Sequence, residues 1–381
     1  MTMEENVKRK TLLYIALTDL KDKSDGVAQK VINQSRAFYN NGYDVDVIAY
    51  ANDAVGLYQR NDFDMVKSVS GTHRFRQRTL FNYARELCGM QYDTVYIRFP
   101  KVTPYMISAL SAHHKAGAKV VVEFASYPLQ WHKPTSFKVW ASQRYYRFFD
   151  HILGGRLHHV ADKALVIGQK VDKAYGITAT NIPNGAELSK IPLRVPSEPG
   201  NELHIVFSAS FYMYQGADRL IEGIAEYEKH RTDDDIRVYA ELLGDGPEYA
   251  RYQRLVEENG LQELVRFHGF LSGNDYDEIF DCCQMAAGAM APHRADIPTG
   301  SALKIKDYMA RGIPFFYCYE EIGLPEDYPY GLRLVSEDTP MDIPRLIEFY
   351  NTYKDKQEDI APDMREYVMS HFSWEEILKD V

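Results

Sequence analysis

The segment from Ala291 to Pro314 holds residue types whose spacing suits phosphate binding. Thr299-Gly300-Ser301 predicts the start of a helix, and Gly312-Ile313-Pro314 predicts its end. The first backbone N–H groups of a helix have no partner within it, and the helix dipole favours anions there. Lys304 would add a positive charge, and Asp307 would lie on the same face. This arrangement suits a nucleotide diphosphate with its ribose hydroxyls, although an ordinary capped surface helix has the same residue pattern.

Four residues of the first half are further candidates for chemistry or substrate contact. Glu123 and Arg98 end two predicted strands, and Tyr127 and His132 follow the first of these. Glu123 or His132 would serve as a general base, whereas Arg98 and Tyr127 would contact a substrate. A Glu at a strand end is also commonly a structural hydrogen-bond partner, and a salt bridge is an equal alternative for Arg98.

The elements that must position these residues alternate between strands and helices. In the first half, hydrophobic patterning predicts strands at 12–17, 44–50, 94–98 and 119–124 and helices at 27–40 and 102–116. In the second half it predicts strands at 202–207, 237–243, 265–268 and 285–291 and helices at 217–229, 249–259 and 276–283. Repeated strand–helix–strand units indicate parallel, doubly wound sheets. The predicted fold class is therefore α/β, with two Rossmann-like domains.

Polar, proline-rich segments separate the two halves. They are Ile182-Pro183-Asn184-Gly185 and residues 191–200, and segments of this kind mark domain boundaries. The boundary predicts an N-terminal domain at 1–185 and a C-terminal domain at 186–365. Because such sheets bind ligands outside the carboxyl ends of their strands, two facing sheets would form an interdomain cleft.

Ser301 to Pro314 resembles the "LKxxEYMAxGxP" signature of family 4 retaining glycosyltransferases of the GT-B fold. Other segments resemble further motifs of that family in the same order along nearly the whole chain. They are Ser24–Val31 (the glycine loop), Asn181–Gly185 ("IPNG"), Gln215–Ile221 ("KGxDxLI"), Gly244–Pro247 ("GDGP"), Phe267–Phe270 ("FxGF") and Phe372–Trp374 ("FSW"). Each motif is weak alone, but the ordered set is specific.

The resemblance implies a role for each matching position. Gly26 would let the backbone approach the donor diphosphate, and Lys304 with the segment Thr299-Gly300-Ser301-Ala302-Leu303 would hold phosphate. Asp307 would bind the ribose hydroxyls, and the loop from His268 to Phe270 would hold the base. The "FSW" motif implies a closing helix at about 365–381 that packs back on the N-terminal domain. Fixed cations and N–H donors stabilise a departing nucleotide diphosphate most in the transition state.

Two departures from the family pattern fall in the donor-binding set. The usual first Glu is Thr299, and the usual Lys of "KG" is Gln215. Loss of that Lys removes a phosphate-binding cation. Arg294, just ahead of the predicted phosphate helix, is the favoured replacement. Arg219 is a second candidate, for which a place on a solvated helix face is the favoured alternative.

Charge and composition narrow the class of protein. Residues 1–199 hold 27 Lys and Arg against 18 Asp and Glu, whereas residues 200–381 hold 17 against 36. This asymmetry predicts that the first half meets something anionic, such as a phosphorylated acceptor or an acidic membrane surface. Basic and aromatic residues interleave over 138–163, which predicts peripheral contact with an anionic membrane. The expected location is the cytoplasm, at the inner face of the cell membrane.

No cofactor, metal ion or nucleic acid is expected. The pairs Asp44/Asp46 and Asp275/Asp277 match the metal-binding "DxD" pattern of another transferase fold, but they lie on a strand and at a helix start, where acids have ordinary roles. The basic excess lacks a nucleic-acid recognition motif.

The sequence as a whole predicts a retaining, metal-independent glycosyltransferase. It would transfer a sugar from a nucleotide diphosphate sugar to a polysaccharide, glycolipid or glycoprotein acceptor in bacterial-type surface glycan biosynthesis. Two alternatives stay open: a catalytically weak, sugar-nucleotide-binding partner of another transferase, and a GT-B-fold nucleotide-sugar epimerase.

Overall fold

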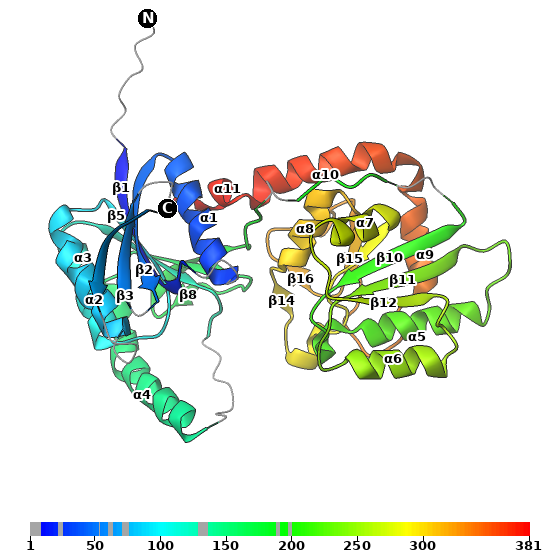
Figure 1. Ribbon diagram of the computed structural model, residues 1–381, viewed down its shortest axis with the longest axis horizontal. Coiled ribbons are helices and arrows are strands. Elements are labelled where there is room, and N and C mark those ends of the chain that lie inside the picture. The colour runs from blue at the N-terminus through cyan, green and yellow to red at the C-terminus, as the bar shows by residue number, and fades with distance from the viewer. Residues whose placement is uncertain are drawn as a thin grey trace, which may run out of the picture. The chain divides into compact units, whose positions relative to one another are not determined.

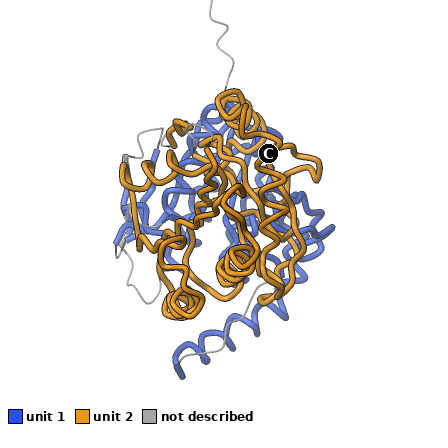
Figure 2. Tube along the Cα trace, turned by 90° about the vertical axis from the view of Figure 1, so that its right-hand side faces the viewer, with its two compact units in different colours: residues 1–182, 374–381 blue, residues 183–373 orange. Residues whose placement is uncertain are grey.

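The computed structural model describes residues 9–21, 26–52, 54–59, 64–70, 76–128, 136–187, 191–196 and 200–381. The chain divides into two compact units (Figure 2): unit 1 comprises Met1–Ile182 and Trp374–Val381, and unit 2 comprises Pro183–Ser373. The division thus falls after residue 182 and after residue 373, where the sequence predicts 185 and 365. Each unit has its own sheet and its own hydrophobic core.

Unit 1 is built on a mostly parallel sheet with strand order β4-β3-β2-β1-β5-β6-β7-β9-β8. The strands are β1 (Lys10–Asp19), β2 (Tyr43–Ala51), β3 (Ala54–Gln59), β4 (Asp64–Ser70), β5 (Thr94–Arg98), β6 (Lys119–Phe124), β7 (Lys163–Ile167), β8 (Lys173–Ala174) and β9 (Ile177–Ile182). β3 and β4 extend the sheet from β2 as antiparallel strands, and β8 lies antiparallel to β9. The strands from β2 through β9 in the sheet are otherwise parallel.

Both faces of this sheet are buried, which explains the continuous apolar run of β1. Leu13 and Ile15 point into a core shared with α2 (Arg76–Glu86) and α3 (Pro104–Lys115). Leu12 and Tyr14 point into the opposite core. Residues of α1 (Gly26–Asn40) and of the C-terminal α11 (Trp374–Leu378), two helices labelled in Figure 1, complete this core. The unit also holds α4 (Phe137–Leu153) and the 3-10 helices η1 (Leu87–Met90) and η2 (Gly154–His159).

Unit 2 contains a parallel sheet with strand order β12-β11-β10-β13-β15-β17. The strands are β10 (Glu202–Ser208), β11 (Arg237–Leu243), β12 (Val265–Gly269), β13 (Met285–Ala287), β15 (Phe315–Tyr317) and β17 (Gly331–Arg333). A separate short pair joins β14 (Thr299–Gly300) to β16 (Glu320–Glu321). The order is that of a doubly wound sheet, in which the chain reverses its direction of winding between β10 and β13.

The helices of unit 2 cover the two faces of its sheet. α5 (Ala217–Glu228) and α6 (Tyr249–Glu258) link β10, β11 and β12, whereas α7 (Asn274–Cys282) and α8 (Leu303–Arg311) belong to the links through β13 to β15. Right-handed crossovers place the first pair on one face and the second pair on the other, as Figure 1 shows. The remaining elements are α9 (Ile343–Asn351), α10 (Gln357–Phe372), η4 (Met213–Gln215), η5 (Pro292–Ala295) and η6 (Lys354–Lys356).

The predicted end of the helix at Gly312 is confirmed. Gly312 is the C-cap of α8 with φ +74°, a conformation that favours glycine. A Cβ at this position would also lie 2.4 Å from the Cα of Ala361 in α10, so a side chain would push the two helices apart. α10 therefore packs on α8 within unit 2, and only the short α11 returns to unit 1.

Candidate active site

The segment before α8 differs from the prediction. Thr299 and Gly300 do not open a helix but form β14, and α8 begins at Leu303 after an N-cap residue, Ala302, that has no side-chain cap. The cap is supplied from elsewhere, because a carboxylate oxygen of Glu321 accepts a hydrogen bond of 3.1 Å from the backbone N–H of Ala302. One of the N–H groups expected to bind phosphate is therefore already engaged.

A buried network fixes this segment. Lys306 is 1% exposed and forms an ion pair with Glu321. Its ammonium also donates a hydrogen bond of 2.8 Å to the hydroxyl of Ser301, which in turn accepts one of 2.8 Å from the backbone N–H of Asn184. Asn184 belongs to the predicted "IPNG" element, so that element anchors the start of α8. Ser301 therefore supports the loop through its side chain.

Lys304, in the first turn of α8, lies in a different environment. Its partly buried ammonium donates a hydrogen bond of 2.7 Å to the side-chain oxygen of Gln215 and lies 4.6 Å from the ring centroid of Phe207. Neither partner carries a negative charge, and Lys304 makes no ion pair in the part of the chain that the structure describes. Burial lowers the pKa of Lys304 from 10.5 to about 7. An anion bound beside this amine would favour its charged form.

Lys304 lies where the sheet changes its direction of winding. Phe207 is near the carboxyl end of β10, and Gln215 is in the loop that follows. That loop contacts the loop after β13, because the carbonyl oxygen of Gln215 accepts a hydrogen bond of 2.9 Å from the N–H of Met290. Open α/β sheets bind ligands at this switch point, outside the carboxyl ends of the strands. Lys304 thus lies at the place where open α/β sheets bind ligands.

Gly216 permits the close contact between these two loops. Its φ is +72°, and a Cβ would lie 2.7 Å from the backbone nitrogen of Ala291. Only glycine therefore fits between the start of α5 and the loop after β13.

Asp307 is three residues beyond Lys304 but has its own partners. Its carboxylate accepts hydrogen bonds from Arg311 at 3.1 Å and from the hydroxyl of Tyr276 at 3.2 Å. The same hydroxyl lies 3.1 Å from the hydroxyl oxygen of Ser208, the last residue of β10. Burial raises the pKa of Asp307, while the Arg311 guanidinium opposes that rise. Lys304 and Asp307 thus both lie near the end of β10, through the contacts of Lys304 with Phe207 and of Tyr276 with Ser208.

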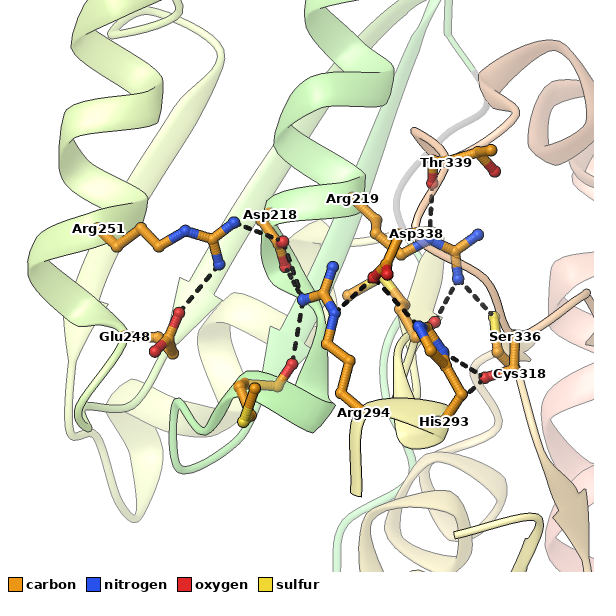
Figure 3. Close-up of polar contacts among 12 residues, drawn as sticks. Asp218, Arg219, Glu248, Arg251, His293, Arg294, Cys318, Ser336, Asp338 and Thr339 are labelled. Carbon is orange, nitrogen blue, oxygen red and sulfur yellow. Dashed lines mark hydrogen bonds and ion pairs between the residues drawn. The ribbon is translucent and has the colours of Figure 1, made fainter. Parts of the chain in front are cut away.

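The two arginines proposed to replace the missing Lys are both engaged within unit 2 (Figure 3). Arg219 is 3% exposed, and its guanidinium donates hydrogen bonds to backbone oxygens of Met290, Thr339 and Val335. These partners give Arg219 a structural role instead of the predicted place in the donor set or on a solvated helix face.

Arg294 forms ion pairs with Asp218 at 2.9 Å and with Asp338 at 2.7 Å. Burial disfavours its charge, but these two carboxylates outweigh burial and raise its pKa. Asp218 also pairs with Arg251 at 2.9 Å, as Figure 3 shows. The charge of Arg294 is therefore neutralised by protein carboxylates, contrary to its predicted role as the substitute phosphate cation.

Of the segment predicted to hold a base, His268 and Gly269 belong to β12 and Phe270 follows it. The His268 ring is 2.7 Å from Glu241 on β11, and Glu241 is also 3.2 Å from His204 on β10. Burial raises the pKa of Glu241, but the hydrogen bonds with the two histidines and the nearby positive charges, Arg266 among them, together outweigh burial and lower it. Phe270 is 86% exposed. Sequence reasoning missed Glu241 and His204, although the alternation of polar and apolar residues along these strands places both on one face of the sheet.

In unit 1, Glu123 is fully buried and ion-paired. One oxygen accepts hydrogen bonds from Gln34 at 2.5 Å and Tyr96 at 2.6 Å, and the other lies 3.3 Å from Lys30 and 3.9 Å from Arg98. Burial raises its pKa, but the two cations and the hydrogen bonds outweigh burial and lower it. A buried carboxylate with a lowered pKa is a poor general base. The contacts therefore favour a structural role for Glu123 over a role as general base. They also favour a salt bridge for Arg98 over substrate contact.

Tyr127 and Gly26, the other described candidates of unit 1, have surroundings of their own. The Tyr127 hydroxyl accepts a hydrogen bond of 3.2 Å from the N–H of Tyr175, and its ring packs on Phe124. Gly26 begins α1, and no heavy atom of the described residues, its chain neighbours and its own helix aside, lies within 4 Å of the position that a Cβ would take there. His132 falls outside the described residues.

Among the described elements of unit 1, α4 carries several exposed aromatic side chains. None of its residues is buried, and Phe137 and Phe148 are 80% and 60% exposed. Its three Lys and Arg side chains are exposed, whereas its acid, Asp150, accepts a hydrogen bond from Tyr175. Of the helices that the structure describes, none is long and apolar enough to cross a membrane. In the same described residues, no group of three or more His, Cys, Asp or Glu side chains could hold a metal ion.

No protein-family model matches the chain, and no curated protein matches it either. Solved structures do match. The Anabaena protein HepE in complex with UDP is 15% identical, with a TM-score of 0.59 and 96% of each chain covered. The lipopolysaccharide outer core galactosyltransferase WaaB in its apo form is 13% identical, with a TM-score of 0.58 and 97% of each chain covered.

The sucrose-phosphate synthase from Thermosynechococcus elongatus is 15% identical, with a TM-score of 0.54, and the match covers 97% of this chain and 96% of that chain. These similar structures are glycosyltransferases of the GT-B fold. The chain therefore has the GT-B fold along nearly its whole length.

Proposed function

We propose that the chain is a glycosyltransferase that binds a nucleotide diphosphate sugar at the carboxyl end of β10. The observation that carries this proposal is the state of Lys304, a partly buried ammonium at the switch point. Its hydrogen-bond partner is Gln215 and its ring partner is Phe207, and it forms no ion pair within the described residues. Burying a charge without a counter-ion costs free energy, and a bound diphosphate would supply the counter-ion. Two of the similar structures are HepE complexes with UDP and with UDP-glucose, which supports a uridine nucleotide as the donor.

In this proposal the residues of unit 2 act on the leaving group. Lys304 stabilises the charge that builds up on the departing diphosphate, and Gln215 orients the amine through its side-chain oxygen. Because Glu123 is a poor base, the acceptor proton would pass to the leaving phosphate, with front-face attack and retention of configuration. No metal ion is required in this scheme, since a protein cation neutralises the phosphate.

The proposed acceptor is a glycan or lipid-linked glycan of a bacterial-type surface polymer. The basic first half supports an anionic acceptor or surface, and WaaB is described as a lipopolysaccharide galactosyltransferase. We further propose that α4 rests on an anionic membrane at the cytoplasmic face, because exposed aromatics and exposed cations lie on the same helix. Sedimentation with phosphatidylglycerol vesicles should remove the wild type from the supernatant but leave the double variant Phe137→Ser/Phe148→Ser in it. Contact through α4 would be contradicted if the wild type and the variant sedimented equally. It would also be contradicted if the wild type sedimented equally well with neutral vesicles.

A partner subunit with weak catalysis is the second candidate, favoured by Gln215 and Thr299 at positions where the family pattern has charged residues. A thermal-shift screen with UDP, GDP, ADP and CMP identifies the nucleotide, because a ligand that binds only the folded chain raises its melting temperature. Turnover of the matching nucleotide sugar with a panel of acceptors then tests transfer. Binding without transfer or hydrolysis across that panel would favour the partner subunit, and turnover without acceptor would favour an epimerase.

The proton NMR spectrum of the product reports the anomeric configuration, and activity in excess EDTA tests independence of metal ions. Inversion at the anomeric carbon would contradict the proposed mechanism.

A further inference from the structure

A pocket of about 430 Å³ opens at the carboxyl edge of the unit 1 sheet. It lies beside Leu17 of β1, Tyr50 of β2 and the residues that follow β5. Its polar lining consists of Tyr50, Arg76, Gln77, Lys101 and Tyr146. Arg76 and Gln77 begin α2, and Tyr146 comes from the middle of α4. None of these residues belongs to the cluster around Glu123.

The lining pairs each cation with an aromatic ring. The Arg76 guanidinium lies 4.5 Å from the ring centroid of Tyr50, and the Lys101 ammonium lies 4.6 Å from that of Tyr146. The Tyr146 hydroxyl donates a hydrogen bond of 3.0 Å to the side-chain oxygen of Gln77, which orients the ring. Cation–π contacts hold a cation in place without neutralising its charge.

The charge of this pocket is positive at neutral pH. Burial raises the pKa of Tyr50 to about 12 and also raises that of Tyr146, so both phenols stay protonated. Among the described residues that line the pocket, no Asp or Glu is present. Arg76 therefore faces the pocket as a cation, and Lys101 adds an ammonium whose pKa is lowered by burial.

We infer that this pocket binds a sugar that carries a phosphate or a carboxylate, as the anionic part of the acceptor. Arg76 offers a planar fork of N–H donors that suits either anion, and Lys101 adds a second cation. The tyrosine rings supply flat apolar surface and hydroxyls for a sugar ring. A volume of 430 Å³ lies in the range of small-ligand pockets, about 300–1,000 Å³. The description of the ligand as an acceptor rests on the proposed function, whereas its binding does not.

The test is calorimetric titration of the full chain with glucuronate, glucose 6-phosphate and glucose, once with saturating UDP and once without UDP. UDP fills the donor site, so phosphate binding there does not add to the signal. At least one anionic sugar should bind about tenfold more tightly than glucose, since a charge-assisted hydrogen bond is worth about 1.5–3 kcal/mol. Tighter binding of glucuronate identifies a carboxylate ligand, and tighter binding of glucose 6-phosphate identifies a phosphate ligand.

Arg76→Gln should weaken that binding about tenfold, and Lys101→Gln should do the same. Arg85→Gln is the matched control, because Arg85 is exposed in the last turn of the same helix. Arg76→Lys keeps the charge and should retain most of the affinity, and melting temperatures show that each variant is folded.

Equal binding of glucose and the anionic sugars, no binding of any of them, or unchanged affinity in both Gln variants would overturn the inference. UDP binding is measured separately on each protein. If the wild type binds no nucleotide, the proposed function is contradicted. If it binds UDP normally but shows no preference for anionic sugars, only the inferred anionic-sugar pocket is contradicted.

Discussion

Replacing Lys304 with Met should change folding stability and UDP affinity in opposite directions. The ammonium is partly buried beside neutral groups, so it disfavours the folded state of the free chain. Met has similar length and keeps the apolar contact with Phe207. If Lys304 had only a structural role, this change would lower the stability of the folded chain. If Lys304 is held for an anionic ligand, the change should raise that stability and weaken UDP binding.

The pKa shift sets the size of the stability change. The pKa of Lys304 falls from 10.5 to about 7, and each pKa unit corresponds to about 1.4 kcal/mol. Allowing for the part of the side chain that solvent still reaches, burial of the charge costs about 3 kcal/mol at pH 7. Lys304→Met should therefore raise the free energy of unfolding by about 2–3 kcal/mol, or the melting temperature of unit 2 by about 5–10 °C. The sign is set by proton binding: between pH 7 and 10.5 the unfolded chain holds more protons at this position, so the advantage of the variant shrinks as pH rises.

UDP affinity should fall about 10- to 100-fold, because a charge-assisted hydrogen bond contributes about 1.5–3 kcal/mol. Denaturant unfolding measures the first effect and calorimetric titration with UDP measures the second. Lys306→Met is the matched control two residues away. It leaves the buried Glu321 without its counter-ion, so it should destabilise the chain by about 3–5 kcal/mol. A lower stability of Lys304→Met, or an unchanged UDP affinity, would refute the reasoning.

Three further outcomes are expected. The dissociation constant of UDP should rise by up to about tenfold per pH unit above pH 7, where Lys304 loses its proton, and Lys304→Arg should remove this dependence in the same titrations. Glu123→Gln should destabilise unit 1 by about 3 kcal/mol, because Lys30 and Arg98 lose their counter-ion. The wild-type contribution of this carboxylate is present above its unfolded pKa and disappears as pH falls through the lowered folded value, which denaturant unfolding between pH 3 and pH 7 would reveal. Gly216→Ala should cost about 2 kcal/mol or more and weaken UDP binding, whereas Gly260→Ala, also at positive φ but with open space around it, should cost only the backbone strain.

Much of the fold could be predicted from patterns within short stretches of sequence. The apolar run of β1 and the helical periodicity of α1 report local geometry and burial, so both elements were predictable. The end of α8 at Gly312 also follows from local chemistry, because glycine adopts the left-handed conformation of a helix C-cap. The start of α8 was predicted too early, since the pairing of β14 with β16 depends on a segment about twenty residues away.

The sequence by itself determined that two lysines, Lys304 and Lys306, stand two residues apart in one predicted helix. Only the tertiary structure decided their roles. Glu321, 15 residues later in the chain, neutralises Lys306, whereas Gln215, 89 residues earlier, leaves the charge of Lys304 uncompensated. The tertiary structure also decided the roles of Arg219, Arg294 and Glu123, because their partners come from distant segments of the chain. Periodicity reports which face of an element is buried, but the free energy of a buried charge depends on the groups that the fold brings within a few ångströms of it.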